Sequence, residues 1–426
     1  MRTIPRPRPY TFGMRTRNIL ALFVAILVLS ISIFASDLAL VHAKIYPSPT
    51  AAPMADGTIL IHDGVITTVG PSATIKAPQT AAIVDCRGFV VTAGFWNSHV
   101  HILTPGLLHA EKRSSSNLSS QLEQMFTRWG FTTVFDIASV LDNTNNIRRR
   151  IEKGEVAGPR ILTVGDPFYP KGGTPVYAKK FLDENHIPSA EVASIPEAVE
   201  RVRRQIKNGA DGIKIFAGAI TAQGVLPMPL DLATAIVSEA HRAGKPVFAH
   251  PSNAEGLEVA IRSGVDVLAH TAPMSGDWSS AFAERLKSRH MALIPTLTLF
   301  DVEAKNAKVS QEEDEKWIRQ AVQELKAYSD AGGEILFGTD IGYIDQYDTA
   351  EEFTLMSRAG MTMQHILASL TTNPAERFGS SARSGRIAQG MDADLVVLDG
   401  DPANDITAFS KVHQVFRQGK QIYPAH

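Results

Sequence analysis

The stretch GFWNSHVHIL, residues 94–103, places two histidines one residue apart within an apolar run. Successive side chains of a β-strand point to opposite faces, so His99 and His101 share one face. Two imidazoles on one face are either a hydrogen-bonded pair in the core or ligands of a metal ion, because neutral imidazole is the commonest protein ligand for metals. The sequence around this stretch distinguishes between these two interpretations.

Between residues 94 and 379, short apolar segments alternate with amphipathic ones. The eight strand candidates are FWNSHVH, TTVFDI, RILTVG, GIKIF, PVFAH, VDVLAH, ALIPTL and EILFGTD. Several of the helical segments between them end in a glycine, which can close a helix in the left-handed conformation. This alternation predicts an α/β fold, a closed (β/α)8 barrel of the TIM type. A doubly wound open sheet is the alternative, but no G-x-G-x-x-G follows the first strand.

Both chain ends show a different pattern, of short strands joined by turns. Residues 57–70, GTILIHDGVITTVG, predict a hairpin with its turn at Asp63-Gly64. Residues 414–423, QVFRQGKQIY, predict a turn at Gln418-Gly419. We expect the two ends to form one small β-sandwich together. The expected ranges are 36–92 and 380–426 for the sandwich and 93–379 for the barrel.

The first 35 residues form a third region. Five arginines and no acidic residue precede the apolar stretch ILALFVAILVLSISIFA, residues 19–35. A basic segment, an apolar run and the small pair Ala35-Ser36 predict a secretory signal peptide. The run is slightly long for such a signal and slightly short for a membrane span, so an uncleaved anchor is the alternative. In both cases we expect an exported protein, periplasmic or extracellular, or one anchored to a membrane through residues 19–35.

Composition excludes several classes of protein. Lys and Arg together number 42 against 44 Asp and Glu, which argues against a general nucleic-acid binder. The single cysteine, Cys86, excludes internal disulfide bonds and a zinc site built from cysteines. We therefore expect a small-molecule partner, no nucleic acid, and a membrane contact only through an uncleaved N-terminal segment. The sequence leaves homo-oligomerisation open.

Side chains of the metal-ligand type end four of the expected strands, where barrel enzymes carry their chemistry. His99 and His101 end the first strand, His250 the fifth, His270 the sixth and Asp340 the eighth. Each has an ordinary structural explanation when it is considered alone. Their joint placement predicts a metal centre at one end of the barrel.

Lys214 lies in the fourth strand between Ile213 and Ile215. If the isoleucines face the helices, the ammonium group points into the barrel, where an unpaired charge is costly. An ammonium group is also a poor neighbour for metal cations. Reaction of the amine with carbon dioxide removes both difficulties, because the product is an anionic carbamate whose two oxygens can bridge two metals.

This arrangement resembles the amidohydrolase superfamily, in its binuclear branch with a carboxylated lysine on the fourth strand. That branch contains prolidase-like dipeptidases, related carboxypeptidases and imidazolonepropionase. The resemblance runs from about residue 37 to the end of the chain and rests on GFWNSHVH, GADGIKIF, VFAHPSNAEGL, VDVLAHTAP, ILFGTD, TTNPAERFG and GRIAQGMDADLVVLDGDP. One position departs from the pattern, because the family usually has aspartate where this chain has Asn97. An asparagine there can orient a ligand as a neighbouring hydrogen-bonding group, but it adds no negative charge.

The resemblance implies two divalent metal ions. His99, His101 and Asp340 would hold one ion, and His250 and His270 the other. Carboxylated Lys214 and a hydroxide would bridge the two ions. Zinc suits these nitrogen and oxygen ligands best, although manganese and cobalt also fit. The hydroxide would attack a carbonyl carbon, and catalytic Asp340 would carry a proton to the leaving amine.

The resemblance predicts a metal-dependent hydrolase that cleaves the amide bond of a dipeptide or an N-acyl amino acid, and the N-terminal segment predicts that this enzyme is exported. A cyclic amide, an imidazolone or a lactone is the alternative substrate class. A mononuclear deaminase is less favoured, because such enzymes do without the strand-four lysine. The alternative that is not an enzyme is a non-catalytic, membrane-attached binding protein. The complete set of metal ligands argues against this alternative. Candidate substrate contacts lie in the loops after the third and eighth strands, at Tyr169, Lys171, Tyr177 and Tyr343.

Overall fold

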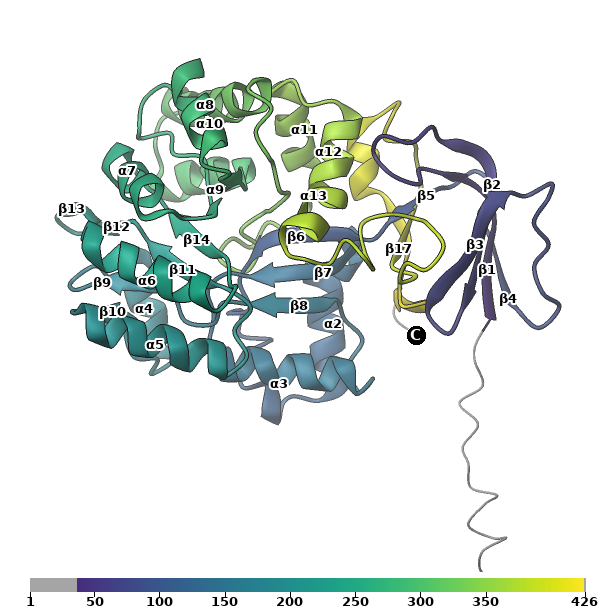
Figure 1. Ribbon diagram of the computed structural model, residues 1–426, viewed down its shortest axis with the longest axis horizontal. Coiled ribbons are helices and arrows are strands. Elements are labelled where there is room, and N and C mark those ends of the chain that lie inside the picture. Colours follow the sequence, from purple (N-terminus) through teal and green to yellow (C-terminus); the bar gives the residue numbers. More distant parts are fainter. Residues whose placement is uncertain (1–36, 425–426) are drawn as a thin grey trace, which may run out of the picture. The chain divides into compact units, whose positions relative to one another are not determined.

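Parallel strands in the middle of the chain form the wall of a barrel (Figure 1). The computed structural model describes residues 37–424, so the predicted signal peptide or anchor lies outside the described residues. One parallel sheet contains β6 (Phe95–Val100), β7 (Phe131–Asp136) and β8 (Arg160–Thr163). A second contains β11 (Ile213–Phe216), β14 (Val247–His250), β15 (Val267–Leu268) and β16 (Ala292–Leu293).

Isolated bridges close these two sheets into a ring. Phe168, which follows β8, pairs with Ile215 of β11. Residues 334–341 pass between the other two edges, with Ile335 paired to Leu293 of β16 and Ile341 paired to Val100 of β6. The eight segments therefore lie in chain order around a closed barrel, which confirms the predicted fold class.

The eighth segment differs from the strand that the sequence predicts. EILFGTD forms bridges only near its ends and no continuous ladder. Asp340, the last residue of the segment, has a φ of 63°, in the left-handed region, so the extended conformation ends there. Backbone hydrogen bonds still hold the segment to β6, from Ser98 N–H to the Phe337 carbonyl at 2.7 Å and from Asp340 N–H to the His99 carbonyl at 2.9 Å.

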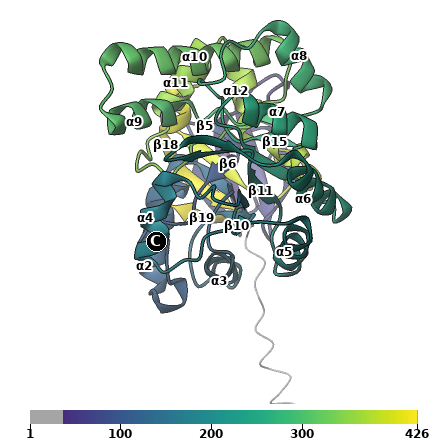
Figure 2. The ribbon, with the colours of Figure 1, turned by 90° about the vertical axis from the view of Figure 1, so that its left-hand side faces the viewer.

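Helices surround the strands (Figure 2). They are α2 (Ser115–Met125), α3 (Leu141–Glu152), α4 (Val176–Glu184), α5 (Ile195–Lys207), α6 (Leu230–Arg242), α7 (Ala254–Ser263), α8 (Ser280–Ser288), α9 (Leu297–Ala307), α10 (Gln311–Asp330), α11 (Ala350–Arg358), α12 (Met363–Leu370) and α13 (Thr372–Arg377). Short additions follow the third and fourth strands: β9 (Tyr169–Pro170) pairs with β10 (Glu191–Val192), and β12 (Gly218–Thr221) with β13 (Gly224–Pro227).

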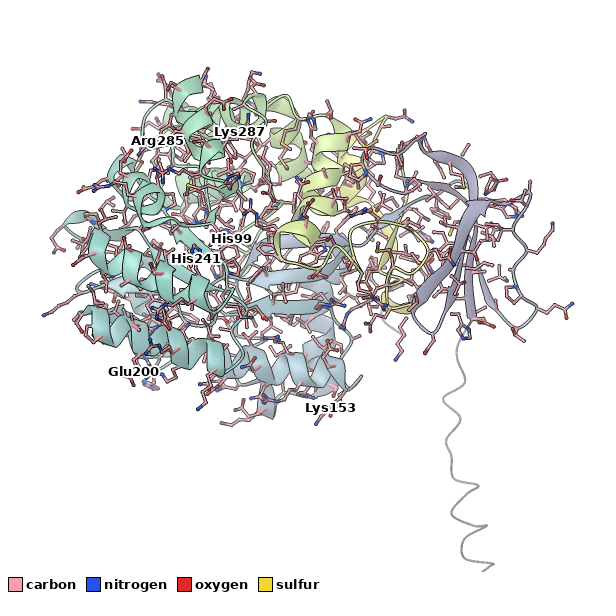
Figure 3. All side chains as sticks on the ribbon, viewed as in Figure 1. His99, Lys153, Glu200, His241, Arg285 and Lys287 are labelled. Atoms are coloured by element: carbon pink, nitrogen blue, oxygen red, sulfur yellow. The ribbon has the colours of Figure 1, made fainter. Side chains whose placement is uncertain are left out.

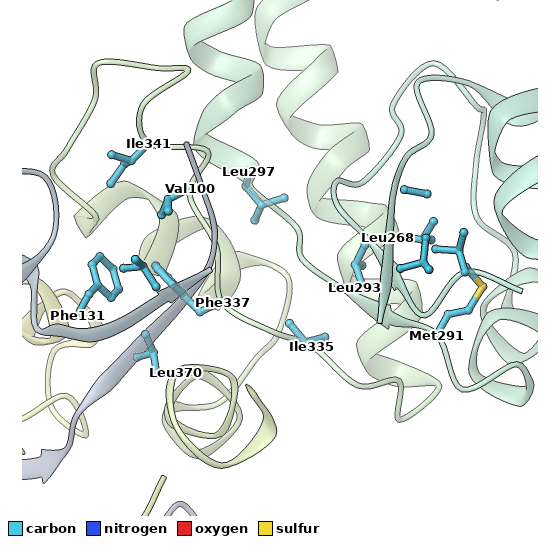
Figure 4. Close-up of a cluster of buried hydrophobic side chains, with 14 of the residues drawn as sticks. Val100, Phe131, Leu268, Met291, Leu293, Leu297, Ile335, Phe337, Ile341 and Leu370 are labelled. Atoms are coloured by element: carbon cyan, nitrogen blue, oxygen red, sulfur yellow. The ribbon is translucent and has the colours of Figure 1, made fainter. Parts of the chain in front are cut away.

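The barrel strands divide their apolar side chains between two cores. Ile213 and Ile215 belong to the large core between strands and helices, together with Val202 of α5. Figure 4 shows another part of this outer core, where Phe131 and Phe337 lie near Leu370. A separate cluster that includes Phe248 and Val267 fills the barrel interior. Lys214, between the two isoleucines, therefore lies on the interior side of β11, as the sequence predicts.

Strands from both chain ends form one eight-stranded sheet. Its members are β1 (Asp37–Ile45), β2 (Met54–His62), β3 (Val65–Pro71), β4 (Ala82–Asp85), β5 (Val90–Ala93), β17 (Leu395–Leu398), β18 (Val412–Arg417) and β19 (Lys420–Tyr423). The order is β19-β18-β17-β5-β1-β2-β3, and β4 also pairs with β1. Figure 1 shows β17, in yellow, near β5, its partner from the N-terminal part of the chain. A shared core joins Leu40 and Ile59 to Leu395 and Phe416, so the predicted β-rich unit built from both ends is confirmed.

Both predicted hairpin turns are present. Asp63 and Gly64 have φ values of 50° and 76°, and Gln418 and Gly419 have 48° and 69°. Two consecutive residues with positive φ are what a two-residue hairpin turn of type I′ requires. Among residues 37–424, no helix is both long and apolar enough to cross a membrane.

Candidate metal centre

Three of the predicted ligands meet at the C-terminal end of β6. The Nε2 atom of His101 lies 2.7 Å from Oδ1 of Asp340, and Nε2 of His99 lies 3.1 Å from the same oxygen. The two Nε2 atoms are 3.3 Å apart. His99 is fully buried and Asp340 is 3% exposed. Figure 3 shows His99 in the interior of the barrel unit, whereas Glu200 lies on the outer helix α5 and Lys153 directly after α3.

Hydrogen bonds at the opposite ring nitrogens fix the orientation of these histidines. Nδ1 of His99 donates to the Ala269 carbonyl and Nδ1 of His101 to the Ala138 carbonyl, both at 2.8 Å. Each neutral ring therefore carries its lone pair on Nε2. Two such lone pairs face a carboxylate oxygen of Asp340 that has no hydrogen-bond donor among the described residues. This donor set fits a divalent cation, because three electron pairs converge where no proton lies between them.

The other two histidines complete the same cluster. The His270 ring centroid lies 4.6 Å from that of His99 and 4.7 Å from that of His250. Nδ1 of His270 donates to Oγ1 of Thr296 at 2.8 Å, and this hydroxyl donates to the Pro295 carbonyl. The lone pair of His270 is therefore also on Nε2. His250 stacks on Phe216 at 4.8 Å between ring centroids.

Lys214 enters the cluster from β11 as a buried amine that is 1% exposed. Within residues 37–424 its Nζ atom has no hydrogen bond or ion pair, and it lies 5.7 Å from the centroid of the Phe216 ring. Burial lowers the pKa of Lys214 to about 7, against the opposing charge of Asp340. A large fraction of the amine is therefore neutral near pH 7, and the neutral amine is the form that reacts with carbon dioxide.

Burial also decides the charge of the histidines. It lowers the pKa of His99 to about 4 and, with the charge of Lys214, that of His250 to about 3. The pKa of His270 lies well below its ordinary value for the same reason. Burial alone would raise the pKa of Asp340, but a proton that enters the centre goes to His99 or His101 first, and the resulting cation holds the pKa of Asp340 well below its usual range. At neutral pH the centre thus offers neutral imidazoles and a carboxylate, the forms that bind metals.

Asn97 has a structural role in this geometry. Its Oδ1 accepts the N–H of His99 at 3.2 Å, and its Nδ2 donates to Oγ1 of Thr339 at 2.7 Å. Asn97 is fully buried, as is the neighbouring part of β6. The asparagine therefore connects β6, which carries the two histidines, to the segment that carries Asp340.

The four candidate substrate contacts occupy different environments. Tyr169 is 6% exposed and packs against Phe216, with 4.7 Å between the ring centroids. Tyr177 and Tyr343 lie 5.2 Å apart, ring to ring. Lys171 is exposed and has no hydrogen bond or ion pair in the described part of the chain. The structure connects the three tyrosines to one another and, through Phe216, to His250, and it leaves Lys171 on the surface.

Sequence reasoning did not identify Glu303 of α9. Its Oε1 accepts a hydrogen bond from the hydroxyl group of Tyr343, with 2.9 Å between the two oxygens. The charge of Asp340 contributes to the raised pKa of Glu303, which places the two carboxylates within electrostatic reach of each other. No motif marks this position, since LFDVEAKNA reads as an ordinary amphipathic helix.

Comparisons with known proteins agree with this geometry. A sequence profile of the amidohydrolase family matches residues 90–422. The ochratoxinase of Aspergillus niger is 24% identical over 97% of this chain and 91% of its own length. The L-hydantoinase of Paenarthrobacter aurescens is 22% identical over 84% and 86%. The crystal structure of a putative prolidase from Bifidobacterium longum superposes with a TM-score of 0.76 at 25% identity, over 91% of this chain and 95% of that one.

Proposed function

This chain belongs to the amidohydrolase family and is a hydrolase of carbon–nitrogen bonds, and on that premise we propose that it cleaves the amide bond of a dipeptide or an N-acyl amino acid. The observation that carries the proposal is the convergence of His99, His101 and Asp340 beside the buried amine of Lys214. The likeness to an ochratoxinase and a putative prolidase supports a linear substrate.

We propose two metal positions. His99, His101 and Asp340 would hold one divalent ion, and His250 and His270 the other, with Lys214 as its carbamate between them. Zinc is the ion we favour, because the ligands are imidazole nitrogens and carboxylate oxygens. Two such ions supply Lewis acidity, which polarises a carbonyl group and lowers the pKa of water to about 7.

Residues of the chain would transfer the proton, keep the metal ligands in position and exclude water. Asp340 is a carboxylate at neutral pH, so it can accept the proton of the attacking water and then donate it to the leaving nitrogen. The fixed Nδ1–H groups of His99, His101 and His270 prevent their rings from rotating. The interior cluster that contains Phe248 closes the barrel below Lys214 and excludes bulk water from that side.

A cyclic amide, an imidazolone or a lactone is the second candidate substrate class. The likeness to an L-hydantoinase is the observation that favours it. We do not favour a deaminase, because Lys214 occupies the position that such enzymes leave without a lysine. Glu255, the acid nearest His250 in sequence, is exposed in the first turn of α7.

We further propose that the protein is exported or anchored to a membrane. The proposal rests on the five arginines and the apolar run of residues 19–35. Fractionation of the producing cells, with mass spectrometry of the mature N-terminus, tests it. A mature chain in the cytosol that still begins at Met1 would contradict it.

The activity test uses the chain from Ser36 onward, which contains the whole described unit. The protein is loaded with zinc in bicarbonate buffer and incubated with pooled dipeptides, N-acyl amino acids, hydantoins and lactones. We expect mass spectrometry to detect free amino acids that are absent with Lys214→Ala and Asp340→Asn. Turnover of the ring compounds alone, from protein that holds about two metal ions per chain, would refute the linear-amide proposal.

A further inference from the structure

A series of contacting aromatic rings, called the aromatic wall below, extends from His250 of the metal centre to Tyr343. Phe216 stacks on His250 at 4.8 Å, and Tyr169 contacts the edge of Phe216 at 4.7 Å between centroids. Tyr177 packs against the cluster that contains Tyr169 and Phe216. It also contacts Tyr343, which follows Asp340 by three residues. The wall therefore ends at the loop that carries the catalytic aspartate.

Glu303 is the acidic group at this end of the wall. Its carboxylate accepts a hydrogen bond from the Tyr343 hydroxyl group and has no ion pair among residues 37–424. Lys305, two positions along α9, pairs instead with Asp301. Burial and the charge of Asp340 both raise the pKa of Glu303, and burial has the larger effect. The hydrogen bond from Tyr343 lowers this pKa but does not cancel the rise. A half-buried carboxylate without a cation is costly, and a positively charged ligand would relieve that cost.

The position of Glu303 indicates which half of the substrate it would meet. Tyr343 donates its backbone N–H to the Asp340 carbonyl at 3.1 Å, and the charge of Asp340 acts on both Tyr343 and Glu303, so this pair lies within electrostatic reach of Asp340. In the proposed reaction Asp340 donates a proton to the leaving nitrogen. The amine half of the substrate therefore lies on the Asp340 side, next to Tyr343 and Glu303.

We propose that Glu303, Tyr343 and Tyr177 form a subsite for a positively charged side chain, an ammonium or guanidinium group, on the amine half of the substrate. The inference rests on the proposed function and deepens it, because it names the class of amino acid that is released. A tyrosine ring attracts a cation, and the carboxylate of Glu303 pairs with it. An acidic side chain would instead meet the charges of both Glu303 and Asp340 and would be excluded.

The test compares substrates that differ only in charge. Alanyl-arginine is paired with alanyl-citrulline, and alanyl-lysine with alanyl-norleucine; alanyl-glutamate is the acidic member. We expect kcat/KM to favour each cationic member over its neutral partner by roughly ten- to hundredfold, the range of a charge-assisted hydrogen bond. Glu303→Gln keeps an acceptor for the Tyr343 hydroxyl and should bring the ratio of kcat/KM between each cationic member and its neutral partner to about one.

Glu312→Gln is the matched control, because Glu312 is an exposed acid in the first turn of α10. It removes the same charge away from the mouth and should leave the preference intact. Equal losses for arginine and citrulline substrates in Glu303→Gln would overturn the subsite. Efficient cleavage of the neutral dipeptides without any cationic preference would overturn it while leaving the proposed function standing.

Calorimetric binding of the free amino acids tests the subsite independently of turnover. Arginine should bind more tightly than citrulline to the unaltered protein and equally to Glu303→Gln. That result would support the subsite even if no dipeptide were cleaved, in which case only the proposed function would fail. Equal binding of arginine and citrulline to the unaltered protein would refute the subsite.

Discussion

Replacement of Asn97 tests whether the link between β6 and the eighth segment holds the metal centre together. Asn97→Ala removes the acceptor for the His99 N–H and the donor to Thr339. Each hydrogen bond contributes about 1 kcal/mol net, and the truncation leaves a small cavity at a fully buried position. We therefore expect the free energy of unfolding to fall by about 2–4 kcal/mol.

Asn97→Asp separates the hydrogen bonds from the charge. The carboxylate still accepts the His99 N–H, and the Thr339 hydroxyl can rotate to donate to it. The added negative charge is buried near Asp340, so it should destabilise the metal-free protein by about 1–3 kcal/mol. Bound divalent ions would offset this cost, so that the destabilisation shrinks or reverses in zinc.

Urea unfolding of both variants, with chelator and with zinc, provides the measurement, and the metal content is determined by mass spectrometry. We expect Asn97→Ala to lose stability in both conditions and to bind metal about 10–100-fold more weakly, as is typical when a partner of a metal ligand is removed. A loss of stability below about 0.5 kcal/mol together with unchanged metal affinity would refute the structural role of Asn97.

Three further predictions concern other buried groups around the centre. Lys214→Met replaces a buried amine without an acceptor by an apolar side chain of similar volume; hydrolysis should be lost while the metal-free protein gains about 1 kcal/mol or more in urea unfolding. Thr296→Val removes the acceptor of His270 Nδ1, so equilibrium dialysis should show metal affinity reduced about 10–100-fold, and unchanged affinity would count against that contact. Burial raises the pKa of Glu352 on α11 from 4.5 to about 7, so the folded state holds this proton more tightly than the unfolded chain. The contribution of Glu352 to stability should therefore be complete below pH 4.5 and fall by about 3 kcal/mol as the pH rises through 7. Glu352→Gln should flatten this part of the pH profile of urea unfolding, whereas an unchanged slope would assign the dependence to another group.

The strand ends of the barrel could be predicted from the sequence because the relevant information is local. Each of His99, His250 and His270 ends an apolar run, and parallel strands in chain order must bring these ends to one rim. The hairpin turns were equally local, since Asp63-Gly64 and Gln418-Gly419 need only two residues with positive φ.

Other parts of the site depend on tertiary contacts that no local pattern encodes. Glu303 lies within an ordinary helix and acquires its role only because α9 brings it to Tyr343. The eighth segment has the composition of a strand, but it forms only isolated bridges at Ile335 and Ile341, and the extended conformation ends at the left-handed Asp340. The function of Asn97 is also non-local, because its second partner, Thr339, is 242 residues away.

The pairing of β17 with β5 has a consequence for folding. The edge of β5 acquires its partner only when residues 395–398 have been synthesised, about three hundred positions later. Until then, the apolar residues of the N-terminal sheet that later contact Leu395 and Phe416 remain uncovered. Such a high contact order slows folding and exposes an open strand edge that can pair with other chains. Completion of the sheet is thus a late step, and a chain that stops before Leu395 should aggregate even though every predicted metal ligand has been synthesised.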